Sequence, residues 1–209
     1  MEVKKEHVDK IFDLAKLSLT FAKINRATHH EDGIRPESDT DHTFMLSLIS
    51  CSLVDSFYKD KLDIGLVSQF ALLHDLVEAY AGDTNSFINI SKETKDEKIK
   101  KEKESLERIK KEFDLEFDWV SKTIEDYESQ NSKEARFVKF VDKFMPEINH
   151  ILSDFSYIKN CGKDKVFFLS FHQDKLEKLE SLYSLEFPEV FEIYKNIWNQ
   201  TLELYKKLP

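Results

Sequence analysis

The sequence predicts an all-α fold, and two observations support that prediction. Glycine and proline, which most often interrupt regular structure, occur only four times each in 209 residues. Long stretches between them carry apolar residues every three to four positions, the period of a helix face, and strand-like alternation is scarce. Because 209 residues fall within the usual size of one domain, we expect a single-domain helical bundle over residues 1–209.

Charge and hydropathy narrow the classes of function. A net charge of −9 disfavours nonspecific binding to nucleic acid or to an anionic membrane, which needs clustered lysine and arginine. No apolar run approaches the roughly 20 residues that span a bilayer, and the first residues lack the apolar core of a signal peptide. We therefore expect a cytoplasmic protein with no nucleic-acid and no membrane partner, in which Cys51 and Cys161 are structural thiols.

The first predicted helix covers residues 3–28. Its apolar residues repeat at helical spacing and predict one buried face, formed by Val8, Ile11, Phe12, Ala15, Leu19 and Ala22. Arg26 lies near the end of this helix, where a cation complements the helix dipole. Because a guanidinium also suits a phosphate, the alternative interpretation of Arg26 is a phosphate clamp.

A polar loop and a second helix follow. Residues 29–41 contain Gly33 and Pro36 among mostly polar residues, which is typical of a loop. The helix begins near Asp41 or His42, with a buried stripe at positions His42, Met45, Leu46, Ile49 and Leu53. Taken alone, His42 is interpreted as a core or capping histidine.

The third predicted helix, residues 63–81, is apolar almost all the way round, as expected for a helix surrounded by others. It nevertheless contains His74, Asp75 and Glu78, and burying such groups without partners is costly. At a step of about 100° per residue, Glu78 lies one turn beyond His74, with Asp75 on the neighbouring flank. One buried histidine is usually a satisfied core residue, but three ionisable groups would each need a separate partner.

Gly82 predicts the end of this helix, because the residue after the last turn often adopts a left-handed backbone. Asp83 then lies at the mouth of the site. A loop, residues 84–90, follows, and its side chains expected to reach that mouth are Asn85, Phe87 and Asn89.

Three more segments have helical periodicity. Residues 91–113 are rich in lysine and glutamate and predict a solvated surface helix. Residues 117–128 form a second amphipathic stretch. The helix predicted over residues 133–152 carries Asp142 on its apolar face, together with Ala135, Val138 and Met145. A carboxylate buried there needs a cation.

The remaining residues, about 164–208, are amphipathic and rich in aromatic side chains, and we expect them to complete the bundle or to form a dimer surface. No chemistry is predicted there. His150 and His172 are interpreted as residues of the surface or the edge of the core.

Three predicted helices contribute inward polar residues that together form a candidate metal site: His42, the adjacent pair His74 and Asp75, and Asp142. Two imidazoles and two carboxylates fit one divalent transition metal ion, Mn, Co, Fe, Zn or Ni, and ligand softness alone does not choose among them. Beside this site, Glu78 is placed to orient or deprotonate a water, Arg26 to neutralise a phosphate, and Asp83 to protonate or orient a leaving oxygen.

The order His, His-Asp, Asp resembles the HD-domain metal-dependent phosphohydrolase superfamily. The segment Glu37-Ser38-Asp39-Thr40-Asp41-His42 is similar to its Glu-Ser-x-x-Glu-His box, with Asp41 in place of the usual glutamate. His74 to Asp83 resembles its His-Asp-x-x-Glu-x-x-x-Gly-Asp box, and Asp142-Lys143 its closing Asp-Lys pair. The match spans roughly residues 20–150, which would form the core of an HD-domain bundle.

Within the superfamily, Asn25-Arg26 resembles the bacterial 5′-deoxynucleotidase branch, in which an arginine at that point contacts the phosphate. The resemblance implies a homodimer that hydrolyses deoxyribonucleoside 5′-monophosphates. Relatives carry a tryptophan after that arginine, packed where a ribose 2′-hydroxyl would lie, whereas this chain has Ala27. The sugar preference is therefore open.

Two alternatives remain at this point. One is another HD hydrolase, acting on (p)ppGpp-like compounds or nucleoside triphosphates, although alarmone hydrolases tend to carry a Glu-Asp pair where this chain has Glu78-Ala79. The other is a non-catalytic, metal-binding HD module used for interaction. Glu78, Asp83 and Arg26 favour an enzyme, because a silent scaffold has no need of groups that activate water and bind phosphate.

Overall fold

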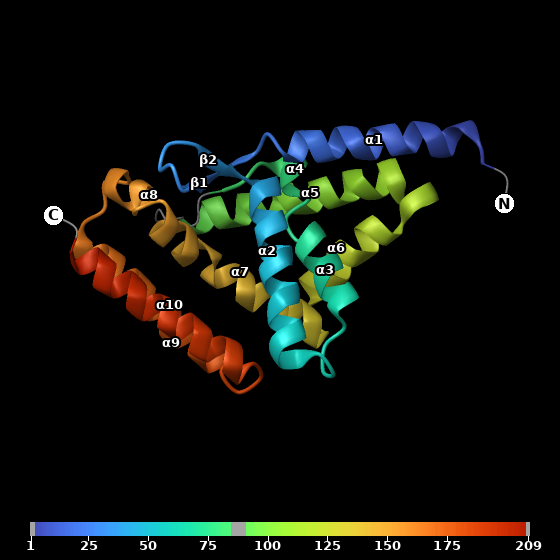
Figure 1. Cartoon of the computed structure of the whole chain (residues 1–209). Helices are drawn as coiled ribbons and strands as arrows, with labels where there is room; N and C mark the ends of the chain where they lie inside the picture. The colour runs from blue at the N-terminus through green and yellow to red at the C-terminus, as the bar shows by residue number, and fades with distance from the viewer. Residues whose placement is uncertain (1–2, 85–90, 208–209) are drawn as a thin grey trace.

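Helices account for most of the residues that the computed structural model describes, 3–84 and 91–207 (Figure 1), and this confirms the all-α prediction. The longer helices are α1 (Lys5–Phe21), α2 (Asp39–Leu53), α3 (Ile64–Leu73), α5 (Lys92–Phe117), α6 (Trp119–Ser129), α7 (Lys133–Leu152), α9 (Lys165–Tyr183) and α10 (Pro188–Lys206). The short elements are β1 (Asn25–His29), β2 (Pro36–Ser38), the π-helix η1 (Val54–Tyr58), α4 (Glu78–Ala81) and α8 (Ser156–Asn160). Within the described ranges, no helix has the length and apolarity needed to cross a bilayer.

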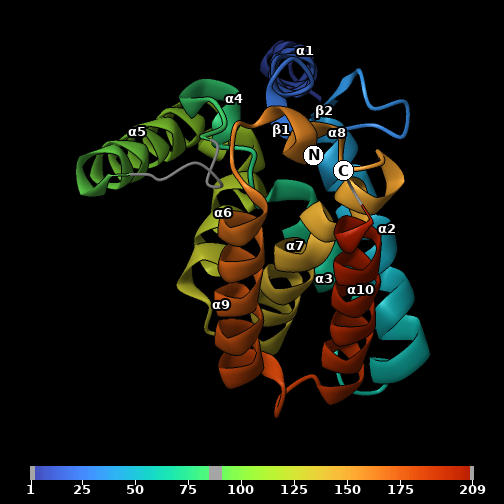
Figure 2. The same cartoon turned by 90° about the vertical axis from the view of Figure 1, so that its left-hand side faces the viewer.

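Helix α7 is the centre of the bundle. It packs against α2 and α3 on one side, while α9 and α10 run alongside it on the other (Figure 2). Its core side chains, among them Phe137, Phe140 and Met145, are fully buried, and Phe140 stacks on Tyr183 of α9 with ring centroids 4.8 Å apart. Removing this apolar surface from water is the main favourable term in folding, so α7 holds the site-bearing helices together.

Helix α1 buries a different face from the predicted one. Val8, Ile11, Phe12 and Leu19 are exposed, whereas Leu17 and Phe21 are buried in a second core with α5 and α6. Apolar residues lie on two overlapping faces of this helix, and only one face reaches the neighbours α4 and α5. The predicted face was therefore wrong, because periodicity alone does not say which of two apolar faces meets the rest of the chain.

A small hairpin replaces the predicted end of the first helix and part of the predicted loop. β1 and β2 pair antiparallel, with Asn25 opposite Ser38. The turn between them is closed by Asp32, whose Oδ1 accepts hydrogen bonds from the backbone amides of Ile34 and Arg35. Gly33 has a φ of +68° in this turn, a backbone conformation that glycine adopts without strain. Residue 26 consequently lies on a strand and not at a helix end.

The predicted central helix is interrupted at His74. α3 ends at Leu73, and the next backbone bonds, from the amide of Leu76 to Leu73 and from that of Glu78 to Asp75, span three residues instead of four. These tighter turns move Asp75 and Glu78 off the even helical spacing that the sequence predicts. The predicted stop is confirmed, since Gly82 has a φ of +76°.

Candidate metal centre

Three buried side chains from three helices bring potential ligand atoms within 4.8 Å of one another: His42 of α2, His74 at the end of α3 and Asp142 of α7. The Nε2 atom of His42 lies 3.0 Å from Oδ1 of Asp142, and that of His74 lies 4.0 Å from the same oxygen. Ser38 begins α2 as a capping box with Asp41, which fixes the first turn, where His42 lies. The sequence predicts that these three residues converge, but it does not predict the distances between their ligand atoms.

Asp75, the fourth predicted ligand, stands beside this group. Its Oδ2 atom is 2.9 Å from Nε2 of His74 and 3.0 Å from Nη1 of Arg26. Asp75 therefore lies between His74, a predicted metal ligand, and Arg26, the predicted phosphate-binding residue. The Arg26 guanidinium and the His74 imidazole keep the pKa of Asp75 well below its usual range, although burial opposes this.

His74 is oriented as a ligand. Its Nδ1 atom donates a hydrogen bond to the carbonyl oxygen of Ala71 at 2.9 Å, because a carbonyl can only accept. In the neutral ring, the form that can bind a cation, the lone pair is then on Nε2, which is buried and faces a second acceptor, Oδ2 of Asp75, at 2.9 Å, so no hydrogen bond joins the two atoms. Leaving such an atom unpaired costs free energy, whereas a divalent cation satisfies it. The residues present thus fit a bound metal ion.

Negative charge exceeds positive charge around this centre. The carboxyl groups are Glu37, Asp39, Asp75, Glu78, Asp83 and Asp142, and the cations that they meet within the described ranges are Arg26, Lys98 and Lys143, together with His42, whose pKa Asp142 and Glu37 raise to about 9. Burial, with Asp75 and Asp83 nearby, raises the pKa of Glu78 to about 10, and burial raises that of Asp39 to about 6. A divalent cation would relieve this repulsion.

Arg26 reaches the centre from β1, where it forms ion pairs with Asp75 at 3.0 Å, Asp39 at 3.4 Å and Glu37 at 3.9 Å. The interpretation of Arg26 as a charge at a helix C-terminus is therefore wrong. Glu37 is itself held by a hydrogen bond from Thr28 and by His42, whose Nδ1 lies 3.6 Å away. The hairpin thus fixes the arginine from both of its strands.

Glu78 and Asp83 meet different neighbours. Glu78 is buried, and its Oε1 is 3.3 Å from Nζ of Lys98, a residue of α5. Asp83 follows Gly82 and lines a cavity with Arg26 and His42; burial raises the pKa of its carboxyl. Lys98 was missed in the sequence, since it lies in a segment interpreted as solvated surface, and only a tertiary contact distinguishes it from its neighbours.

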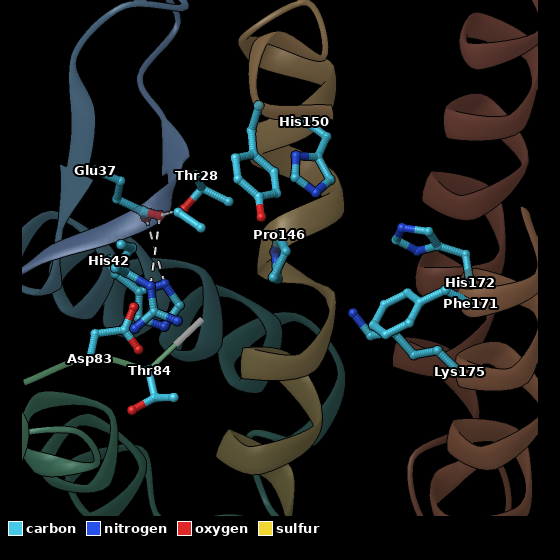
Figure 3. A pocket seen from close by; sticks show the side chains of 13 residues that line it. Thr28, Glu37, His42, Asp83, Thr84, Pro146, His150, Phe171, His172 and Lys175 are labelled. Atoms are coloured by element: carbon cyan, nitrogen blue, oxygen red, sulfur yellow. Dashed lines mark hydrogen bonds and ion pairs between the residues drawn. The ribbon is translucent and has the colours of Figure 1, made fainter. Parts of the chain in front are cut away.

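That cavity, of about 100 Å³, runs from Arg26 and His42 past Pro146 to α9 (Figure 3). Its described lining residues are Arg26, Ala27, Thr28, Glu37, His42, Asp83, Thr84, Pro146, His150, Tyr157, Phe171, His172 and Lys175. The other side chains predicted at the mouth, Asn85, Phe87 and Asn89, lie outside the described residues.

The C-terminal part of this wall contradicts the sequence interpretation. His150 and His172 are buried, with 3% and 1% of their surface exposed, and do not lie at the surface or core edge. Nδ1 of His172 donates a hydrogen bond to Oε1 of Glu147 at 2.9 Å, because the ionised carboxylate can only accept, and Lys175 meets the same carboxylate. On α9, Phe168, His172 and Leu179 share a buried face, so helical periodicity placed His172 inward and could have revealed it.

The sequence of this chain is similar to those of known proteins. A family model described as "HD domain" matches residues 21–183. A human protein named 5′-deoxynucleotidase HDDC2 is 34% identical over 111 residues, which are 52% of this chain and 50% of that protein. The fission yeast Schizosaccharomyces pombe has a protein named 5′-deoxynucleotidase hdd1 that is 30% identical over 116 residues, 53% of this chain and 54% of its own. The chain spans about half the length of these curated relatives.

Two solved structures share the fold. A protein described as a predicted metal-dependent phosphohydrolase, from Magnetospirillum magnetotacticum, superposes with a TM-score of 0.77 at 18% identity, over 98% of this chain and 97% of its own. The PH0347 protein of Pyrococcus horikoshii gives a TM-score of 0.55 at 23% identity, over 94% and 99%. At these identities the likeness concerns the arrangement of the helices alone.

Proposed function

This chain belongs to the HD domain family, and from that premise we propose that it is a metal-dependent 5′-nucleotidase that hydrolyses nucleoside 5′-monophosphates to nucleoside and phosphate. The observation that carries the proposal is the meeting of His42, His74 and Asp142 next to Arg26, at one end of a cavity. Relatives named 5′-deoxynucleotidase support this substrate class.

The proposed metal ligands are His42, His74, Asp75 and Asp142, and the ion is one of Mn, Co, Fe, Zn or Ni. When bound, this ion supplies Lewis acidity towards the phosphate and makes a nearby water acidic enough to attack phosphorus. The unpartnered Nε2 of His74 and the surplus of carboxylates support a divalent ion there. Each would be left uncompensated without one.

The chain's own side chains then divide the remaining tasks. Glu78, whose pKa the charge of a bound metal ion would lower again, takes the proton of the attacking water as the new oxygen–phosphorus bond forms. Arg26 holds and neutralises the phosphate, which the acidic surroundings would otherwise repel. Asp83, whose raised pKa favours the protonated carboxyl, gives its proton to the 5′-oxygen as the phosphorus–oxygen bond to the nucleoside breaks.

The remaining parts of the proposal concern organisation. One domain, residues 1–209, would contain the motif-bearing core at about 20–150, with helices α9 and α10 completing the bundle. The exposed apolar side chains of α1, Val8, Ile11, Phe12 and Leu19, support a homodimer, because such a stripe is costly in water. The acidic net charge of −9 disfavours a nucleic-acid or anionic-membrane partner, and we propose a cytoplasmic protein with a small-molecule nucleotide substrate.

The experiment is phosphate release from a panel of deoxy- and ribonucleoside 5′-monophosphates, with (p)ppGpp and a deoxynucleoside triphosphate included. The protein is first stripped of metal and then given Mn²⁺ or Co²⁺. We expect metal-dependent release from the monophosphates, absent in Asp75→Ala, and a loss of about 10² to 10⁴ in kcat for Glu78→Ala with metal still bound. Turnover of the other compounds alone would move the protein to another HD activity, and no turnover at all would favour a metal-binding module.

A further inference from the structure

The cavity beside the metal centre has two chemically different ends (Figure 3). The charged end is formed by Arg26, Glu37, His42 and Asp83, next to the proposed metal ligands. The aromatic end is formed by His150 of α7, Tyr157 of α8, and Phe171 and His172 of α9. A ligand that fills the cavity therefore has one end among charges and the other among rings.

The rings of the aromatic end are held in place by further aromatic contacts. His150 stacks on Tyr157 at 9° between their planes, with centroids 6.1 Å apart. His172 stacks in the same way on Trp198 of α10, at 19° and 5.1 Å. Because His150, His172 and Trp198 are buried and Tyr157 is half-buried against them, these rings form a wall that does not need to be ordered by a ligand.

Among the residues that the structure describes, this end carries no unmatched charge. Lys175, which lines it, approaches both oxygens of Glu147 at 2.9 and 3.2 Å, so its charge is balanced by a buried carboxylate. Burial lowers the pKa of His150 to about 3 and lowers that of His172, so both imidazoles are neutral near pH 7. A second phosphate group would find no available cation at this end.

We infer that the aromatic end binds the nucleobase of the substrate, a planar and uncharged heterocycle, while Arg26 holds the single phosphate. The inference rests on the proposed function and adds to it the residues that select the leaving group. Phe171 contributes an aromatic side chain at this end. Packing against such rings stabilises a bound nucleobase, whichever of the bases it is. Lys175 can donate the third hydrogen of its ammonium group to a carbonyl oxygen of the base.

The test compares two phosphate esters, a deoxynucleoside 5′-monophosphate and 2-deoxyribose 5-phosphate. The second carries a hydroxyl where the first carries its nucleobase. We expect kcat/KM of the wild type to favour the nucleotide by roughly tenfold or more, chiefly through KM. In Phe171→Ala this preference falls to near one, while the rate on the sugar phosphate is retained. Phe171→Tyr, which keeps an aromatic ring, keeps the preference.

The matched control is Leu182→Ala, an exposed apolar residue of the same helix, which should keep the wild-type preference. A second measurement does not need catalysis: calorimetric binding of a deoxynucleoside, without phosphate, to the metal-stripped protein. We expect binding that Phe171→Ala weakens roughly tenfold. The unfolding midpoint of each variant shows that the fold is intact.

The outcomes separate the two proposals. Equal kcat/KM for nucleotide and sugar phosphate in the wild type, or an unchanged preference in folded Phe171→Ala, overturns the inference and leaves the phosphatase. A wild type that hydrolyses neither ester contradicts the proposed function, and the nucleoside titration then decides whether the aromatic end binds a base. No nucleoside binding in that protein overturns the inference as well.

Discussion

Helix α7 contributes a carboxylate to each of two clusters of buried ionisable groups, and the two clusters differ in how their charge is balanced. In the first, the metal centre, six carboxyl groups meet four cations within the described residues, His42 included, and Nε2 of His74 faces the acceptor oxygen of Asp75. In the second, which we name the α7–α9 ion cluster, one carboxylate, Glu147, meets one ammonium, Lys175, and the ring of His172. The second cluster is complete by itself.

This difference distinguishes a ligand site from a structural ion pair. Both clusters are buried, and both would appear in a sequence as polar residues on apolar helix faces. A buried carboxylate that a lysine and a histidine already satisfy has little to offer a metal ion. Glu78 and Asp39, whose pKa values are raised by burial and by neighbouring carboxylates, gain when a cation enters.

The largest expected contrast comes from neutralising one carboxylate in each cluster. Asp75→Asn should lower phosphatase kcat by about 10³-fold or more, because the bound ion supplies several kcal/mol of transition-state stabilisation. Its unfolding free energy should fall less than that of Glu147→Gln, because Arg26 keeps Asp39 and Glu37 as partners. Glu147→Gln should instead destabilise the fold by about 2 to 4 kcal/mol, since it leaves Lys175 and His172 without their buried partner.

The measurements are metal content, phosphate release and urea unfolding of both variants, with Asp154→Asn as a control for neutralising an exposed carboxylate. We expect Glu147→Gln to bind metal as the wild type does. If it loses its metal while remaining folded, the two clusters are coupled and the distinction drawn between them fails.

Lys98 tests whether the metal centre extends beyond the residues that the sequence predicts. Its ammonium faces Glu78, and removing that charge should raise the pKa of Glu78 further. Because a general base must be ionised, kcat/KM of Lys98→Met should fall roughly tenfold near pH 7 and recover as the pH rises. Lys98→Arg should restore most of the rate at neutral pH.

The control is Lys101→Met on the same helix, since Lys101 pairs only with the exposed Glu97. A pH–rate profile of kcat/KM checks the prediction. A uniform loss at every pH would show that Lys98 acts through the fold and not through the charge of Glu78.

The residues of the metal centre could be predicted from the sequence because they violate a local rule. His42, His74 and Asp142 stand at core positions of apolar helices, where an imidazole or carboxylate needs a specific reason. The all-α class followed from the same periodicity, and the predicted helix over residues 133–152 has the bounds of α7. Both kinds of information are local.

What the sequence did not reveal depends on partners far along the chain. Lys98 differs from other lysines of α5 only through Glu78, 20 residues away, and Lys175 meets Glu147 across 28 residues. The hairpin that carries Arg26 exists because two short segments pair, and neither alternates strongly enough to predict a strand. Such pairings are decided by packing of the whole bundle and not by the pattern of one segment.

Ala27 provides a smaller test, of the sugar end of the cavity. Its small side chain lines the cavity beside Arg26. The small side chain leaves room for a 2′-hydroxyl, so we expect the wild type to accept ribo- and deoxyribonucleotides alike. Ala27→Trp should lower kcat/KM for ribonucleotides by roughly tenfold relative to deoxyribonucleotides. Paired rates on AMP and dAMP check this, and a strong deoxy preference in the wild type would contradict it.

The smallest effect concerns the stability of the metal-stripped protein, in which the two regions should respond to pH in opposite directions. Glu78 has a pKa raised to about 10, so its folded form holds a proton that the unfolded chain releases, and stability is lost as pH rises from about 4.5 towards 10. His150 has a pKa lowered to about 3, so stability is lost as pH falls from about 6.5 towards 3.

Glu78→Gln should therefore make the metal-free protein more stable at pH 8, by about 1 kcal/mol, while abolishing most activity. His150→Phe should flatten the acid side between pH 6.5 and 4.5, above the range in which Glu147, with its pKa near 2, begins to titrate. Urea unfolding with a chelator present, from pH 4.5 to 9, measures both. Because added metal favours the ionised carboxylates, it should reverse the advantage of Glu78→Gln; an advantage that persists with metal bound would mean that Glu78 does not respond to the ion.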